Sequence, residues 1–83
     1  MLKVYIGNNV ERYSYMINEQ STLREACQEA EATNGFEWQG KLLQLDGGTI
    51  SAGDLDKTFV QLGYDGNSDK AVYLTSVKKA DNA

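Results

Sequence analysis

The stretch that decides the fold is TLREACQEAEATNGFEWQGKLLQLDGGTISAG, residues 22–53. It opens with Thr22 and Glu25, whose T-x-x-E spacing is that of a capping box at the start of a helix. Asn34-Gly35 is a typical helix stop signal. Small and apolar residues recur between them at three- and four-residue spacing: Leu23, Ala26, Cys27 and Ala30. The pattern predicts one amphipathic helix whose small side chains allow it to lie close over a sheet.

A hairpin is predicted directly after this helix. Residues 41–45 alternate, with Leu43 and Leu45 on one face, and Asp46-Gly47 is a strong signal for a tight hairpin turn before a short return strand at Thr49-Ile50. Helix and hairpin both have an apolar side to bury. The flanking segments, 2–17 and 71–77, must therefore complete the sheet.

The flanking segments read as three more strands. Residues 2–6 alternate at period 2, Gly7-Asn8-Asn9 suits a tight turn, and a return strand is expected at about 10–17. We expect the return strand to turn Tyr13, Tyr15 and Ile17 inward. The last strand, 71–77, has Val72 and Leu74 on one face and Tyr73 and Thr75 on the other.

A short helical segment is expected between the second hairpin and the last strand. Asp54 is placed to cap it. Leu55, Phe59 and Leu62 follow at spacings that bring them to the core side. The predicted order is strand, strand, helix, strand, short strand, short helix, strand.

Composition limits the function classes. The 83 residues allow one domain, and 41% hydrophobic with 24% charged residues is ordinary globular usage. No window approaches the ~20 apolar residues of a membrane span, and the N-terminus alternates like a strand, so we expect a cytoplasmic protein without membrane association. The net charge of −4 and scattered cations give no electrostatic basis for binding nucleic acid.

The residue inventory also argues against enzyme chemistry. There is no histidine, so Ser-His-Asp and Cys-His sites cannot be assembled, and the single Cys27 sits on the apolar helix stripe, where it fits a small hydrophobe better than a nucleophile. Residues 65–69 begin like a calcium loop, but Lys70 and Ser76 stand where that motif needs Gly and Glu. Asp54 and Asp56 invite a paired-carboxylate reading, against which stands the capping role of Asp54. We expect no catalytic, cofactor-binding or metal-binding residues.

In the order of its predicted elements, the chain resembles the ubiquitin-like β-grasp family. Residues 22–53 align with ubiquitin without a gap, including Thr22, Gly35, Gly47 and Gly53, and the element order fits over about 1–77. The resemblance implies an α+β fold in which a mixed four- to five-stranded sheet wraps around one helix, with the first and last strands parallel at its centre. It implies a domain over 1–77, followed by a polar flexible tail at 78–83. The implied core residues are Leu2, Val4, Ile6, Leu23, Leu43, Leu45, Val72 and Leu74.

Two functional features of ubiquitin are not matched. Ubiquitin-like modifiers end in Gly-Gly, whereas this sequence ends KKADNA, and Gly47-Gly48 lies inside the predicted hairpin. Gln44 falls where ubiquitin has the central isoleucine of its recognition patch, so we expect partners that read that patch not to bind. A ubiquitin-like modifier or sulfur-carrier precursor, activated at its C-terminus after removal of the tail, is the alternative function. A small-molecule-binding β-grasp domain is a third, although no clustered ligand set supports it.

The remaining candidate site is the outward face of the sheet. If Val4, Leu43 and Leu74 point inward, an amphipathic set of residues on three adjacent strands points outward, with Tyr5 and Tyr73 as cross-strand neighbours. The predicted protein-binding residues are Tyr5, Leu42, Gln44, Tyr73 and Thr75. The sequence thus favours a non-enzymatic module that binds a partner protein, with weak self-association through the same face as a second expectation. The plain alternative is that tyrosines simply suit a strand exposed on one side.

Overall fold

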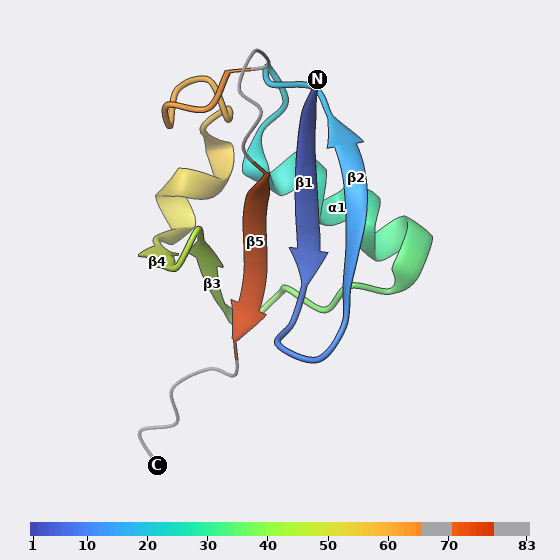
Figure 1. Cartoon of the computed structure of the whole chain (residues 1–83). Coiled ribbons are helices and arrows are strands. Elements are labelled where there is room, and N and C mark those ends of the chain that lie inside the picture. The colour runs from blue at the N-terminus through green and yellow to red at the C-terminus, as the bar shows by residue number, and fades with distance from the viewer. Residues whose placement is uncertain (66–70, 78–83) are drawn as a thin grey trace.

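The computed structural model describes residues 1–65 and 71–77 of the chain and contains a five-stranded sheet and one α-helix (Figure 1). The elements in chain order are β1 (Leu2–Gly7), β2 (Arg12–Ile17), α1 (Leu23–Asn34), β3 (Leu42–Leu45), β4 (Gly48–Ile50), the 3-10 helix η1 (Ala52–Asp56) and β5 (Val72–Val77). The strand order is β2-β1-β5-β3-β4, and β1 and β5 run parallel at the centre. The predicted mixed β-grasp sheet is confirmed.

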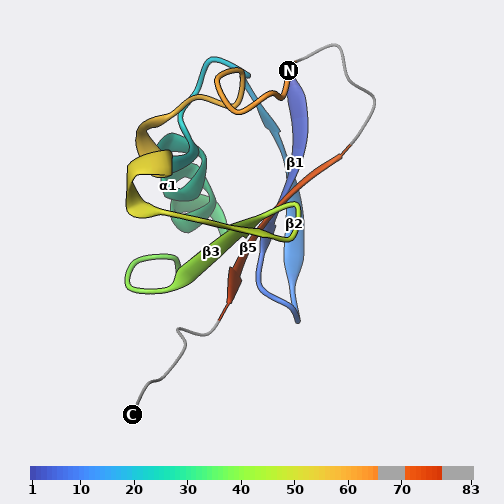
Figure 2. The ribbon, with the colours of Figure 1, turned by 90° about the vertical axis from the view of Figure 1, so that its left-hand side faces the viewer.

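The molecule has two layers. In Figure 2 the helix α1 lies on one side of the sheet, and within the part of the chain that the structure describes no helix or strand lies over the opposite side of β1, β2 and β5. We call the side away from α1 the outer face. This arrangement divides each strand into inward residues that build the core and outward residues that are available to a ligand.

The predicted helix signals are confirmed. Thr22 Oγ1 accepts from the Glu25 N–H at 3.1 Å, and the Glu25 carboxylate accepts from the Thr22 N–H at 2.8 Å. Gly35 ends the helix with φ 71°, and its N–H donates to the Glu31 carbonyl at 2.9 Å. The stripe that α1 turns to the sheet is completely buried, as expected: Leu23, Ala26, Cys27 and Ala30.

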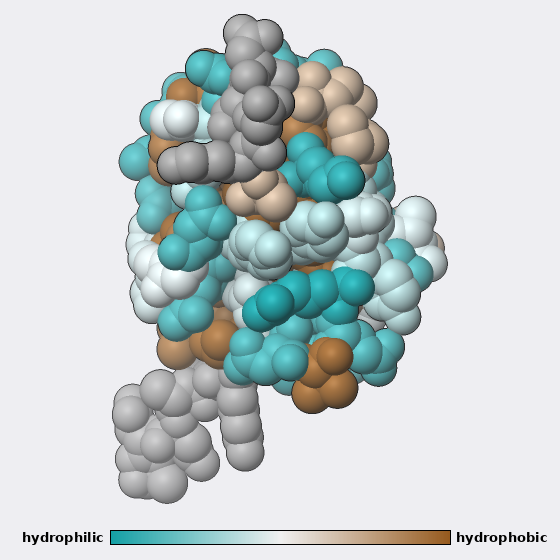
Figure 3. All heavy atoms as spheres, viewed as in Figure 1, coloured by the Kyte–Doolittle hydropathy of each residue, from teal (hydrophilic) through white to brown (hydrophobic). Residues whose placement is uncertain are grey.

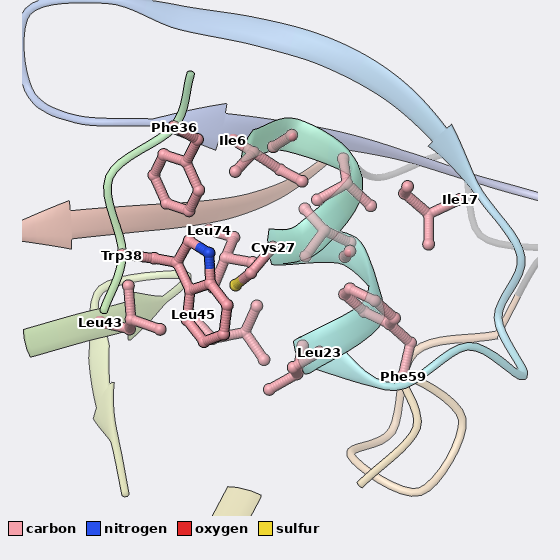
Figure 4. Close-up of a cluster of buried hydrophobic side chains, with 14 of the residues drawn as sticks. Ile6, Ile17, Leu23, Cys27, Phe36, Trp38, Leu43, Leu45, Phe59 and Leu74 are labelled. Atoms are coloured by element: carbon pink, nitrogen blue, oxygen red, sulfur yellow. The ribbon is translucent and has the colours of Figure 1, made fainter. Parts of the chain in front are cut away.

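The core is larger than the sequence indicated. All eight core residues implied by the resemblance are buried, as are Ile17 and Phe59, which were also expected to face inward, and the structure adds Phe36 and Trp38 (Figure 4). The Trp38 side chain is only 6% exposed, and its Nε1–H donates to the Glu31 carboxylate at 2.7 Å. The loop between α1 and β3 therefore closes one end of the core.

Of the three side chains of the return strand that were expected to turn inward, one needs correction. Ile17 is buried and Tyr15 is half-buried, as expected, and the Tyr15 hydroxyl accepts from the Asn34 side chain at the end of α1. Tyr13 is 45% exposed instead of buried. Because Tyr15 already reaches the last helical residue, Tyr13 lies beyond the end of the helix, and its hydroxyl donates to Glu11 at 3.1 Å.

The short helical segment is confirmed, but its cap is not the one predicted. Ser51 is the N-cap of η1, and the carboxylate of Asp54 accepts from the Ser51 N–H at 3.0 Å and its hydroxyl at 3.2 Å. Phe59 is fully buried, while Leu55 and Leu62 are half-buried against the core. Residues 66–70, which hold most of the calcium-like pattern, and the predicted tail at 78–83 lie outside the described residues.

Candidate protein-interaction surface

Two tyrosines stack at the centre of the outer face. Tyr5 of β1 and Tyr73 of β5 are direct partners in the parallel register, and their ring centroids are 5.1 Å apart with an interplanar angle of 19°. The predicted cross-strand contact is therefore confirmed. Figure 3 shows pale, moderately hydrophilic side chains side by side across the middle of this face, bordered by strongly hydrophilic ones.

A cation completes the tyrosine stack. The guanidinium carbon of Arg12 lies 5.5 Å from the centroid of the Tyr73 ring, within cation–π range. Arg12 belongs to β2, two strands away from Tyr73, and its partner on the intervening strand is Gly7. Because Gly7 has no side chain, nothing on β1 at this level blocks the path of Arg12 toward Tyr73. We call Tyr5, Tyr73 and Arg12 the outer-face cluster.

Hydrogen bonds from Asp46 fix the backbone of Tyr73 in place. The Tyr73 N–H donates to the Asp46 carboxylate at 2.9 Å, and the Asp46 N–H donates to the Tyr73 carbonyl at 2.8 Å. Asp46 also accepts from the Tyr64 hydroxyl at 2.8 Å, and burial together with this bond raises the pKa of Tyr64 to about 12. The turn between β3 and β4 thus holds the strand that carries Tyr73.

The other predicted surface residues differ in accessibility. Leu42 is exposed and Gln44 is half-buried, and Gln44 pairs with Thr75 across β3 and β5. Thr75 was expected to line the accessible surface, but it is only 6% exposed. Thr75 lies on a central strand, where its partners on the two adjacent strands are Gln44 and Gly7. Its side chain is short and the much larger Tyr73 is two positions away, so neighbouring side chains screen it from solvent.

Sequence reasoning missed the role of β2 in this surface. Arg12 and Met16 lie on the outward side of β2, and Met16 is an exposed apolar side chain opposite Lys3 of β1. The alternation of β2 was the available signal, because Arg12, Ser14 and Met16 share one face. It became informative only once the strand order placed β2 beside β1.

The groups that could support chemistry have structural roles. Cys27 is fully buried, and burial raises the pKa of its thiol to about 12, so the thiol is neutral and unreachable at physiological pH. Gly47 has φ 88° in the β3–β4 turn, which explains the glycine at that position of the internal Gly47-Gly48 pair. Within residues 1–65 and 71–77, no group of three acidic, cysteine or histidine side chains is arranged to hold a metal ion. No helix in that same part of the chain is long and apolar enough to cross a membrane.

Solved structures of ubiquitin-like domains resemble this fold. The ubiquitin-like domain of yeast Ddi1 matches with a TM-score of 0.66 and 18% identity, covering 99% of this chain and 93% of that one. The C-terminal ubiquitin-like domain of the human 2'-5'-oligoadenylate synthetase-like protein matches at 0.62 and 19%, covering 99% and 90%. A ubiquitin-like protein from the archaeon Caldiarchaeum subterraneum matches at 0.54 and 13%, covering 96% and 99%.

The sequence itself matches no protein-family model and no curated protein. The parallel central pair of strands, the single helix across the sheet and the three structural likenesses nevertheless agree on one architecture. This chain has the ubiquitin-like β-grasp fold.

Proposed function

We propose that this protein is a non-enzymatic, cytoplasmic interaction module that binds a partner protein through the outer face of its sheet. The observation that carries the proposal is the outer-face cluster, in which Arg12 lies over a tyrosine stack built on the two central strands. Tyrosine and arginine are enriched among residues that dominate binding energy at protein interfaces. Ubiquitin-like domains often serve as protein-interaction modules, which agrees with this proposal.

The rigidity of the cluster supports the same conclusion. The Tyr73 backbone is held by Asp46 on one side and by the parallel ladder to β1 on the other, and its ring packs against Tyr5 and Arg12. Side chains that are already ordered lose little conformational entropy when a partner binds. A surface built in this way is suited to recognition without rearrangement.

The chemistry of the partner follows from the charges on this face. Lys3 and Arg12 flank the tyrosine stack, Met16 adds apolar area on β2, and Leu42 adds apolar area farther along the sheet, where it pairs with Val77 of β5. The complementary partner presents apolar or aromatic side chains together with carboxylates. Nothing in the described surface favours activation of the C-terminus, and self-association through this face stays a prediction that sedimentation velocity can test.

Site-specific photo-crosslinking tests the proposal. A benzophenone amino acid is placed at Met16, which is on the outer face of β2, or at Tyr13, which is on the opposite face of the same strand. The proposal predicts a crosslinked protein adduct from position 16 that disappears when Tyr5 and Tyr73 are both changed to Ser. Equal adducts from the two positions, or adducts that survive the double substitution, would contradict it.

A further inference from the structure

A second surface feature is an open groove on the other side of β3. It encloses about 650 Å³ between the loop that precedes β3, the start of α1 and the segment from β4 to η1. Trp38 and Leu43 are buried beneath it, and Ile50 and Leu55 are half-buried along its sides. Figure 4 shows Trp38 and Leu43 side by side at this end of the core. The groove thus offers apolar contacts without opening the core.

The charge of this groove differs from that of the whole molecule. Among the described residues that line it, Arg24 and Lys41 are cationic and none is acidic, although the chain carries a net charge of −4. Another hollow, of about 560 Å³ between the β1–β2 hairpin and the end of α1, is lined by Glu11 and Glu37 and also by Lys41, so acidic side chains outnumber cationic ones there. We call the first hollow the basic groove.

The two cations of the basic groove are available to a new partner. Arg24 Nε contacts Asp56 at 3.0 Å and Lys41 Nζ contacts Glu37 at 3.7 Å, and each cationic side chain is 40% exposed. Exposed ion pairs of this kind contribute little stability, so exchanging one carboxylate for another costs little. The Asp56 contact uses only the Nε of Arg24, and the guanidinium has further donors on its two Nη atoms.

We propose that the basic groove binds a short segment of a partner protein in which apolar side chains alternate with carboxylates. The apolar side chains would contact the Trp38, Ile50 and Leu55 surfaces, while the carboxylates would pair with Arg24 and Lys41. This proposal does not depend on the outer-face cluster. It adds a second binding site that adjoins the outer face at Leu42, which lines the groove, but that contains none of the cluster residues.

Amide chemical-shift mapping tests the proposal with defined peptides. The labelled full chain is titrated with acetylated, amidated Glu-Leu-Glu-Leu-Glu and with the matched Gln and Lys versions of the same peptide. We expect shifts at amides of residues 38–43 and 50–55, about tenfold weaker binding of the Gln peptide, and weaker binding as salt is raised. No binding of the acidic peptide up to about 10 mM, or binding of all three peptides with equal strength, would overturn the proposal.

Substitutions that each remove one positive charge distinguish binding in the basic groove from a general effect of the net charge of the protein. Arg24→Gln and Lys41→Gln should each weaken the acidic peptide about threefold to tenfold, and Lys41→Arg should restore binding. Lys57→Gln is the control, because Lys57 also pairs with a nearby carboxylate, at 3.2 Å, but does not line the groove. An equal loss in Lys57→Gln, or shifts centred on Tyr5 and Tyr73, would exclude the groove and leave the outer-face proposal untouched.

Discussion

Phe59 is the side chain through which the segment after η1 is attached to the core, and its removal gives a sharp prediction. The ring is fully buried, and the Phe59 N–H donates to the Ser21 carbonyl at 3.2 Å just before α1. Phe59→Ala should lower the free energy of unfolding by about 3–5 kcal/mol through lost burial and the cavity left behind. A chain of 83 residues has a total stability of about 4–12 kcal/mol at typical values per residue, so the loss is a large fraction of it.

Urea unfolding followed by tryptophan fluorescence measures this effect, because Trp38 is the only tryptophan and is buried. If Phe59→Ala does not fold, Phe59→Leu keeps most of the volume and should cost at most about 1.5 kcal/mol. Val60→Ala is the neighbouring control, since Val60 is exposed, and it should cost less than about 0.5 kcal/mol. A loss below about 1 kcal/mol in Phe59→Ala would show that the segment does not contribute to the core as described.

Three further perturbations test the core, the first hairpin and the support of Tyr73. Burial raises the pKa of the Cys27 thiol from 9.0 to about 12, so on raising the pH the unfolded chain loses this proton before the folded chain does. Between pH 9 and about pH 12 the unfolding free energy of the wild type should therefore fall relative to that of Cys27→Ala, by up to about 1.4 kcal/mol per pH unit, and urea titrations at several pH values measure this difference. A Cβ on Gly7 would lie 2.1 Å from a backbone oxygen, whereas one on Gly48 would lie at an ordinary 3.6 Å, so Gly7→Ala should lower the melting temperature much more than Gly48→Ala. Asp46→Ala removes two hydrogen bonds to a charged acceptor and should lower the free energy of unfolding, measured by chemical denaturation, by about 2 kcal/mol or more. In the same variant an absorbance titration should show the pKa of Tyr64 falling from about 12 toward its ordinary value.

Local signals in the sequence predicted the elements and their order. The capping box at Thr22, the stop at Gly35 and the Asp46-Gly47 turn each depend on only a few neighbouring residues, and all three are present in the structure. The parallel pairing of Tyr5 with Tyr73 was also foreseen, because the resemblance supplied the strand order that alternation alone does not contain.

Features that depend on the lengths of elements or on distant segments were not predictable in the same way. Whether Tyr13 is covered depends on where α1 ends relative to β2, and the burial of Thr75 depends on the size of its neighbours on adjacent strands. The loop with Trp38 has no periodicity to show that it closes the core. The basic groove joins Arg24 to a loop and to β4, which lie far apart in the chain.

The central claim is that a partner protein binds the outer face through the tyrosine stack. Once a crosslinked partner is purified, its affinity for Tyr73→Ala and Tyr13→Ala is the most direct measurement, because the two tyrosines are 42% and 45% exposed and lie on opposite faces. Calorimetry should give about thirtyfold weaker binding for Tyr73→Ala, as for a dominant interface residue, and less than about twofold for Tyr13→Ala. Equal losses in the two variants, or an unchanged affinity in Tyr73→Ala, would contradict the claim.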